Sequence, residues 1–216
     1  MENTFVLTGI GTEVGKTVCS AVLVKVLAAD YWKPVQSGDL HATDTMKVAR
    51  WNGIELPSER FHPERWRLRT PMSPHAAADI DGVRIEAADF GLPKTTNPLL
   101  IEGAGGLFVP LNEQLTLLDV FAQWQLPTIL VSYNYLGSIN HTLLSIAQLR
   151  QRNIPIAGII FNGPATPTTE SVIEQMTGVP VLFRMPVLAE VNAQTITSTA
   201  TQIQTELRSN LTAYLS

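Results

Sequence analysis

The stretch G-I-G-T-E-V-G-K-T, from Gly9 to Thr17, decides how this sequence folds. A short apolar run at 5–8 precedes it, and a long apolar segment at 18–29 follows it. This order predicts a buried strand, a glycine-rich loop and a helix. The backbone N–H groups of such a loop point at phosphate oxygens, a lysine reaches the β- and γ-phosphates, and a hydroxyl binds Mg²⁺. The stretch therefore predicts a nucleotide site that uses Lys16 and Thr17.

The spacing of the glycines departs from the usual G-x-x-x-x-G-K-[ST] by one residue, because Gly9 lies one position further from Gly15. An ordinary strand-to-helix turn with a glycine cap is the alternative interpretation. The position of G-K-T between an apolar strand and an apolar helix favours a variant phosphate loop.

Composition and charge narrow the class of protein. The chain has 216 residues, of which 45% are hydrophobic, so we expect one domain over 1–216 with one sizeable core. The net charge is −4 without a run of Lys or Arg, which argues against nucleic acid as a partner. No apolar run reaches membrane-spanning length and no targeting pattern opens the chain, so we expect a cytoplasmic protein without a membrane partner. The single cysteine, Cys19, excludes an internal disulfide and is expected to be buried.

Strand and helix patterns alternate along the chain. After the first strand, loop and helix, we expect strands at 30–35, 98–102, 127–133, 156–161 and 179–183, and helices at 43–52, 85–92, 117–124, 139–152, 169–176 and from 193. Residues 53–74, which are rich in proline, are expected to be irregular. The pattern predicts an α/β fold of the single-domain P-loop type, with a mostly parallel sheet and helices on both faces. Ligands of such sheets bind at the carboxyl ends of the strands.

The helix at 18–29 is apolar on nearly all sides. Such a helix is buried, and we expect it to pack against the sheet and to offer an interface to a second subunit.

Three more charged residues are expected at the carboxyl edge of the sheet. Glu102 closes an apolar strand, where P-loop proteins place an acid that holds Mg²⁺; an exposed strand end is the alternative. Asp44 follows the loop after the second strand and adds a second carboxylate, or else caps a helix. Lys33 ends the second strand, and the alternative for it is an ordinary solvated lysine.

The glycines at 103–106 either cradle an anion or form a turn that needs positive φ. The four histidines lack the spacing of metal ligands, and no G-x-S-x-G motif occurs. The residues alone thus predict a Mg-nucleotide enzyme or switch without naming a substrate.

Six segments of the sequence together resemble the ATP-dependent dethiobiotin synthetases. They are G-I-G-T-E-V-G-K-T at 9–17, K-P-V-Q-S-G at 33–38, S-P-H at 73–75, E-G-A-G-G at 102–106, L-G-S-I-N-H at 136–141 and the strand end at Asn162. The resemblance covers residues 5–190. It implies a ligase that makes dethiobiotin, ADP and phosphate from 7,8-diaminononanoate, CO2 and MgATP, through a carbamate and a carbamic–phosphoric anhydride.

The resemblance also implies roles for single residues. Lys16 and Lys33 would face the carbamate and the γ-phosphate as catalytic residues. Mg²⁺ would be held by Thr17, Asp44 and Glu102, and Asn162 would read adenine. The ATP-binding set would be Glu13, Val14, Gly15, Lys16, Thr17, Val18, Asp44, Glu102, Gly103, Ala104, Gly105, Asn162, Gly163, Pro186, Val187 and Leu188. The substrate set would be Ser37, Leu136, Gly137, Ser138, Ile139 and Asn140, of which 136–140 would receive the substrate carboxylate across the interface of a homodimer.

The competing interpretation is an ATPase switch like MinD and ParA, because these partition and division-site proteins share the sheet and a variant phosphate loop. They carry an extra lysine early in the loop, which this chain lacks. The chain also has Gly11 where many synthetases have an aspartate. The C-terminal apolar stripe at 203, 207, 211 and 215 has Arg208 as its only basic residue, which favours packing over membrane binding.

Overall fold

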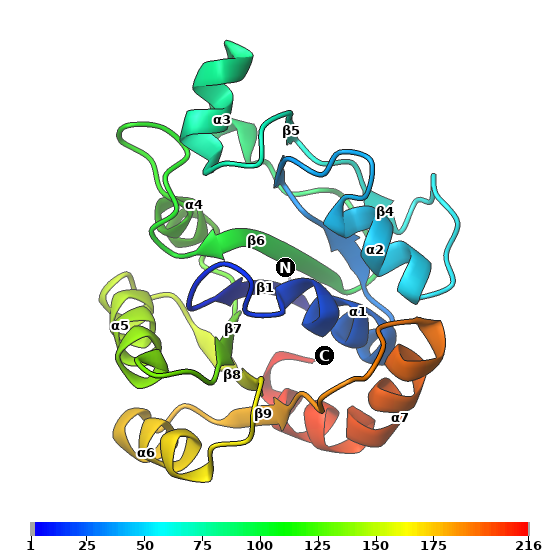
Figure 1. Ribbon diagram of the computed structural model, residues 1–216, viewed down its shortest axis with the longest axis vertical. Helices are drawn as coiled ribbons and strands as arrows, with labels where there is room; N and C mark the ends of the chain where they lie inside the picture. Colours follow the sequence, from blue (N-terminus) through cyan, green and yellow to red (C-terminus); the bar gives the residue numbers. More distant parts are fainter. Residues whose placement is uncertain (1–2, 216) are drawn as a thin grey trace.

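A parallel seven-stranded sheet forms the centre of the computed structural model, which describes residues 3–215 (Figure 1). Its strand order is β4-β2-β6-β1-β7-β8-β9, and its paired strands run parallel. The strands are β1 (Thr4–Gly9), β2 (Asp30–Trp32), β4 (Phe61–His62), β6 (Leu99–Gly106), β7 (Thr128–Tyr133), β8 (Ile156–Asn162) and β9 (Val181–Arg184). The predicted α/β fold with a parallel sheet is confirmed.

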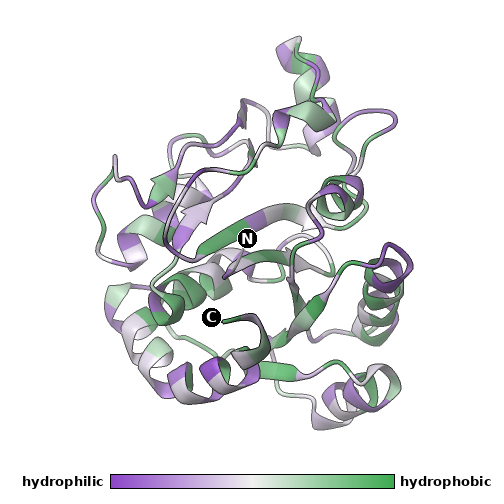
Figure 2. Cartoon of the chain, turned by 180° about the vertical axis from the view of Figure 1, so that it is seen from behind, coloured by the Kyte–Doolittle hydropathy of each residue, from purple (hydrophilic) through white to green (hydrophobic). Residues whose placement is uncertain are grey.

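Helices cover both faces of the sheet. They are α1 (Lys16–Leu27), α2 (Asp44–Trp51), α3 (Pro74–Asp81), α4 (Leu117–Trp124), α5 (Ser138–Gln151), α6 (Pro167–Thr177) and α7 (Ala193–Asn210). In Figure 1, α1, α2 and α7 lie on one side of the sheet, whereas α4, α5 and α6 lie on the other. Hydrophobic residues gather on the sheet strands between these layers, and polar residues lie on the loops and the outer turns of helices (Figure 2).

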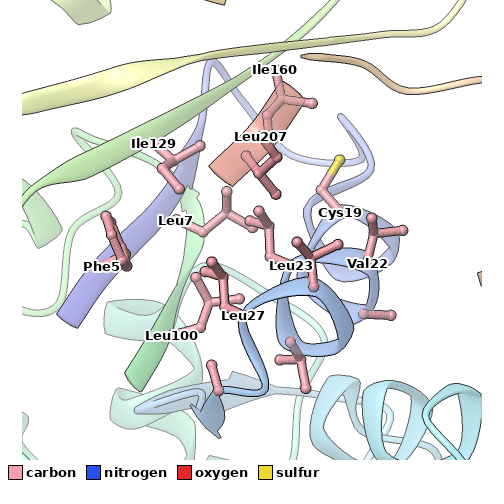
Figure 3. Close-up of a cluster of buried hydrophobic side chains, with 14 of the residues drawn as sticks. Phe5, Leu7, Cys19, Val22, Leu23, Leu27, Leu100, Ile129, Ile160 and Leu207 are labelled. Atoms are coloured by element: carbon pink, nitrogen blue, oxygen red, sulfur yellow. The ribbon is translucent and has the colours of Figure 1, made fainter. Parts of the chain in front are cut away.

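Helix α1 is buried inside its own chain. Figure 3 shows Leu23 and Leu27 of α1 among Leu7 and Leu100 of the sheet and Leu207 of α7. Nine of the twelve residues of α1 are buried. Its apolar sides are therefore filled by the sheet, α2 and α7, and the expectation that this helix offers a subunit interface is wrong. Cys19 is buried on it, as expected.

The segment expected as one strand at 30–35 is two. Strand β2 ends at Trp32, and β3 (Val35–Ser37) pairs instead with β5 (Trp66–Leu68) in a separate two-stranded parallel sheet. Pro34 has no backbone N–H, so it cannot continue a central strand. Its carbonyl oxygen accepts a hydrogen bond from Trp66 N at 2.9 Å. The strands β4 and β5 also show that 53–74 is only partly irregular.

The helix expected at 85–92 is wrong, because the structure has only a 3₁₀ turn there, Ala87–Asp89. Helix α3, which begins at Pro74 directly after Ser73, was not predicted from the sequence. Proline is favoured in the first turn of a helix, where its missing N–H costs nothing, and Ala76 to Ala78 favour the helix that follows.

The C-terminal stripe packs inside the chain as predicted. Ile203, Leu207 and Leu211 are buried and belong to the same cluster as α1. Among residues 3–215, no helix combines the length and the apolar character that crossing a membrane requires. The other helices and strands begin and end close to their expected positions.

Candidate active site

The carboxyl ends of β1, β2 and β6 meet at one edge of the sheet, and four polar side chains converge there. Thr17 lies in the first turn of α1, Lys33 directly follows β2, Asp44 opens α2 and Glu102 lies on β6. Strand side chains alternate between the faces, so Glu102 shares with Leu100 the face that α1 covers. We call Thr17, Lys33, Asp44 and Glu102 the polar cluster.

Short contacts join all members of the polar cluster. Thr17 Oγ1 lies 3.0 Å from Asp44 Oδ1 and 3.3 Å from Glu102 Oε1. Lys33 Nζ donates to Glu102 Oε1 at 3.2 Å and also to Asp44 Oδ2. Lys33 is 6% exposed and Glu102 is 1% exposed, so neither the solvated lysine nor the exposed strand end holds.

The two ions of the Lys33–Asp44 pair stabilise each other's charge. Burial lowers the pKa of Lys33, but the nearby carboxylates of Glu102 and Asp44 outweigh burial and hold that pKa above its ordinary value. Burial raises the pKa of Asp44, yet the Lys33 ammonium outweighs it and the net shift is downward. Asp44 is not the helix cap, because the side chain of Thr43 caps α2 by accepting from Met46 N at 3.2 Å.

The second lysine, Lys16, has a different environment in the phosphate loop. Its ammonium donates to Gly11 O at 3.0 Å, and the residue is 7% exposed. Burial is the largest effect and lowers the pKa of Lys16 to about 8. The loop itself turns through left-handed conformations at Glu13, with φ of 59°, and at Gly15, with φ of 89°. A Cβ at Gly15 would lie 2.1 Å from Asn162 Nδ2, so this position requires glycine.

Two hydroxyls that were not predicted from the sequence also reach Glu102. Ser20 Oγ donates to Glu102 Oε2 at 2.5 Å, and Tyr31 OH donates to the same oxygen at 2.9 Å. The pattern carried a signal for both. Ser20 is the one hydroxyl in the otherwise apolar part of α1 and lies three residues after Thr17, on the same helix face. Tyr31 lies two residues before Lys33, on the same side of the strand.

A pocket of about 300 Å³ lies beside the phosphate loop at the carboxyl ends of β8 and β9. Its lining brings together six predicted residues, which are Val18, Asn162, Gly163, Pro186, Val187 and Leu188, with Tyr133 and Met185. Asn162 Nδ2 donates to Val14 O at 2.9 Å, which joins this pocket to the phosphate loop. The pocket is apolar apart from its amide and backbone groups, as a site for a flat heterocycle would be.

The glycines after Glu102 continue β6, which ends at Gly106. Gly106 pairs with Gly9, and a Cβ on it would lie 3.3 Å from Gly9 O, so the strand runs close beside the phosphate loop. Gly105 has φ of 73°, and a Cβ there would meet Val109 at 2.8 Å. The expectation that one of these glycines needs a positive φ is therefore confirmed at Gly105. Gly103 and Ala104 precede it on β6.

The remaining predicted residues lie on β3 and at the start of α5. Ser37 lies on β3, in the small sheet. Residues 136–140 open α5, with Gly137 as its N-cap at φ of 107°. Leu136 and Asn140 are exposed, Ile139 is half-buried and Ser138 is buried. Helix α5 follows β7, which two strands, β6 and β1, separate from β2. Adjacent strands are about 4.8 Å apart, so the end of β7 lies about 14 Å from the end of β2.

The polar cluster fits a magnesium ion by the chemistry of its atoms. One hydroxyl and two carboxylates provide the hard oxygen ligands that Mg²⁺ prefers, and phosphate oxygens and waters usually complete its shell. No group of three or more His, Cys, Asp and Glu suited to a metal occurs among residues 3–215. A metal in this part of the chain would therefore depend on Thr17 and a nucleotide as well as on Asp44 and Glu102.

Sequence comparison places the chain among nucleotide-binding proteins. The family described as AAA domain matches residues 3–195. ATP-dependent dethiobiotin synthetase BioD of Brucella anthropi is 50% identical over 192 residues, which are 89% of this chain and 90% of the relative. The proteins of the same name are 49% identical over 196 residues in Rhodopseudomonas palustris, covering 91% of both chains, and 48% identical over 197 residues in Afipia carboxidovorans, covering 91% and 93%.

Solved structures show the same fold at low identity. The MinC:MinD cell division protein complex of Aquifex aeolicus has a TM-score of 0.58 at 12% identity and covers 96% of this chain and 94% of that one. Chloroplast FtsY from Physcomitrella patens has a TM-score of 0.50 at 14% identity and covers 93% and 65%. Likeness at such identities shows the fold alone and does not favour a switch. Since the sequence relatives match over about nine-tenths of both chains, the chain belongs to the ATP-dependent dethiobiotin synthetase family.

Proposed function

We propose that this enzyme makes dethiobiotin from 7,8-diaminononanoate, CO2 and MgATP, releasing ADP and phosphate. The observation that carries the proposal is the polar cluster beside the phosphate loop, where two buried lysines and two carboxylates lie within one sheet edge. The names of the sequence relatives support the product, dethiobiotin, and the use of ATP.

The proposed reaction asks the protein to position reactants and to balance charge. One amine of the substrate adds to CO2 and loses a proton, which gives a carbamate without a protein nucleophile. A carbamate oxygen then attacks the γ-phosphorus of ATP, and ADP leaves from the mixed carbamic–phosphoric anhydride. The second amine attacks the carbonyl carbon, phosphate leaves, and the ureido ring closes. Each step places negative charge between the amines and the γ-phosphate, where fixed cations lower the barrier.

The two lysines match the two places where this charge develops. Lys16 lies in the phosphate loop, where it would contact the β- and γ-phosphates. Lys33 is held by Asp44 and Glu102 with its charge favoured, so its ammonium remains available to the carbamate. Magnesium, when bound by Thr17, Asp44 and Glu102, would neutralise phosphate charge and orient the γ-phosphoryl group.

The ATP proposal follows the pocket and the loop. Residues 13–18 would wrap the phosphates with backbone N–H groups, and the strand at 103–105 would border them. The pocket lined by Val18, Gly163 and 186–188 would take adenine. Asn162 would read the base with the part of its amide that does not donate to Val14 O.

We also propose a homodimer in which the substrate carboxylate binds the N-terminus of α5 in the partner subunit. Six bonds separate the amine-bearing C7 from the carboxyl carbon, and a chain of six bonds spans about 7 Å, as two extended residues do. In the same subunit, the end of β7, which precedes α5, is about 14 Å from the end of β2, three strand spacings away. Ser37 lies four residues after Lys33 in the chain and would contact the substrate near its amines.

Exposed apolar side chains support the dimer. Phe108 is 61% exposed and Leu144 is 55% exposed, and both line a pocket of about 460 Å³ between α5 and the start of the phosphate loop. Leu136 at the start of α5 is fully exposed. A second copy that covers this surface would bring its own α5 N-terminus toward the neighbouring site, which fits the shared carboxylate.

The test is product formation with each reactant left out in turn. We expect ADP and dethiobiotin in equal amounts only when diaminononanoate, CO2 and MgATP are all present. Lys16→Ala should lower the rate by about 10³-fold or more, because it removes a cation at the transferring phosphoryl group. ADP release that is independent of diaminononanoate, or near-normal turnover by folded Lys16→Ala protein, would contradict the proposal, and the former would favour the switch.

A further inference from the structure

Glu102 offers its two carboxylate oxygens to two different environments. Oε1 faces Thr17 and Lys33, at 3.3 and 3.2 Å, toward the phosphate loop. Oε2 faces inward, where it accepts from Ser20 Oγ at 2.5 Å and from Tyr31 OH at 2.9 Å. We infer that Ser20 and Tyr31 are positioning residues that fix the Glu102 carboxylate, so that Oε1 alone remains for the metal or a metal-bound water.

Both hydroxyls are built as donors to this oxygen. A carboxylate only accepts, so the protons must come from Ser20 and Tyr31. Both residues are fully buried, and the hydrogen bonds to Glu102 are the ones that the described structure gives their hydroxyls. A serine inside a helix commonly bonds a backbone carbonyl of the preceding turn. The Ser20 hydroxyl is directed at Glu102 instead, which ties α1 to β6.

The tyrosine comes from a third element and is itself held in place. Tyr31 lies on β2 opposite Leu100 of β6, and its ring packs against Phe61 with centroids 5.7 Å apart. Burial, followed by the charge of Glu102, raises its pKa well above the ordinary value, so the hydroxyl keeps its proton. One oxygen of Glu102 is thus fixed by donors from α1, which also carries Thr17, and from β2, which Lys33 directly follows.

Fixing Oε2 has a defined consequence for the metal. A carboxylate whose inner oxygen accepts two hydrogen bonds cannot turn about its last bond without breaking both. Glu102 then offers one oxygen, Oε1, which lies 3.3 Å from Thr17 Oγ1, while Asp44 Oδ1 lies 3.0 Å from the same hydroxyl. The inference rests on the proposed function only in that Glu102 holds the metal; it does not depend on which substrate is made into product.

The experiment measures Mn²⁺ binding to the enzyme–ADP complex by the loss of the free Mn²⁺ EPR signal. The variants are Tyr31→Phe, which removes only an oxygen atom, and Ser20→Ala. Loss of partners that orient a metal ligand typically weakens metal affinity by about 10- to 100-fold, and we expect a rise in the Mn²⁺ Kd at the lower end of this range for each variant. The two hydroxyls share one oxygen, so the double variant should depart from additivity.

Matched controls separate positioning from general stability. Tyr214→Phe removes a hydroxyl that donates to Ile156 O, and Ser171→Ala removes one on α6 that accepts from Gln175; both lie away from the polar cluster. These controls should leave the Mn²⁺ Kd unchanged. In Tyr31→Phe, the ADP Kd measured in EDTA should also stay unchanged, because the hydroxyl does not face the nucleotide loop.

The Mn²⁺ measurements test the positioning role separately from the proposed function. An unchanged Mn²⁺ Kd in folded Tyr31→Phe and Ser20→Ala overturns it, as does an ADP Kd in EDTA that rises as much as the Mn²⁺ Kd. If one variant fails to fold, the other still decides the question. If the unmodified enzyme makes no dethiobiotin but the two variants still bind Mn²⁺ more weakly than it does, the proposed substrate is refuted and the positioning role stands.

Discussion

Two lysines within one site have pKa values shifted in opposite directions, although both face the same two carboxylates. The negative charges of Glu102 and Asp44, which also accept hydrogen bonds from Lys33, together outweigh the effect of burial and raise the pKa of Lys33. Lys16 bonds only a backbone carbonyl, so burial dominates and its pKa falls to about 8. The pKa of Lys33 is therefore held above its ordinary value, whereas the pKa of Lys16 lies near 8, within the pH range in which an enzyme can be assayed.

This difference predicts a pH dependence of nucleotide binding. ADP phosphates favour the charged form of Lys16, so binding is strongest below the free-state pKa of about 8 and weakens as the pH rises through it. Measured by calorimetry in EDTA from pH 7 to 9.5, the ADP Kd should rise by up to about tenfold per pH unit above 8. Lys16→Arg should flatten the profile, because a guanidinium stays charged. A wild-type Kd that does not change over this range would contradict the assignment.

At the scale of elements, the junction between β1 and α1 connects phosphate binding to the base pocket. The phosphate loop ends at Gly15, and the amide of Asn162 from the end of β8 fills the space where a side chain would lie. The same amide donates to Val14 O. Gly15, at the N-terminus of α1, is therefore packed against Asn162, the side chain that we propose to read the base.

The junction predicts a contrast between two glycines. Gly15→Ala would place a methyl group 2.1 Å from Asn162 Nδ2 at a φ of 89°, so ATP affinity should fall by at least about tenfold and the free energy of unfolding by about 1–2 kcal/mol. Gly11→Ala is the matched control, because no atom lies within 4 Å of its Cβ position. Calorimetric ATP titration and urea unfolding measure both effects. Equal behaviour of the two variants would show that the junction does not couple the loop to the pocket.

Elements also show how far the sequence could be interpreted. The strand of Glu102 and the loop of Lys16 were predictable, because apolar periodicity and a glycine motif are local signals. The break at Pro34 was visible as a proline, but its consequence, a second sheet with β5, depends on residues 66–68 far along the chain. The contacts of Ser20 and Tyr31 with Glu102 arise only from packing between α1, β2 and β6.

At the scale of the whole molecule, the site of one chain leaves the substrate incompletely held under the proposed function. The polar cluster and the base pocket lie at the carboxyl ends of the strands, whereas the start of α5 is exposed beside a separate apolar pocket. Helix α1, on which the sequence led us to expect a subunit interface, instead packs inside the chain. Phe108 and Leu144 are better candidates, since their apolar surface is exposed.

The shared site predicts complementation between two inactive variants. Lys16→Ala removes the phosphate contact, and Asn140→Asp adds a charge that repels the substrate carboxylate at the start of α5. If each site uses both subunits, a mixed dimer retains one intact site. Random mixing of equal amounts should then restore about one quarter of wild-type activity. Lys16→Ala mixed with Asp44→Asn should stay inactive, because both changes affect the same half of each site. Absence of restored activity after verified subunit exchange would refute the shared site.

The buried thiol of Cys19 gives this enzyme an internal reporter of helix opening. It lies on α1 two residues after Thr17, and burial, followed by the charge of Glu102, raises its pKa to about 12. An alkylating reagent requires an accessible thiolate, so it reacts only with molecules in which α1 has separated from the sheet. Nucleotide bound at the N-terminus of the same helix favours the closed form by mass action. The rate of labelling in the unmodified protein therefore measures how often α1 separates from the sheet. The decrease of this rate when nucleotide is added measures how strongly the bound nucleotide stabilises the closed form.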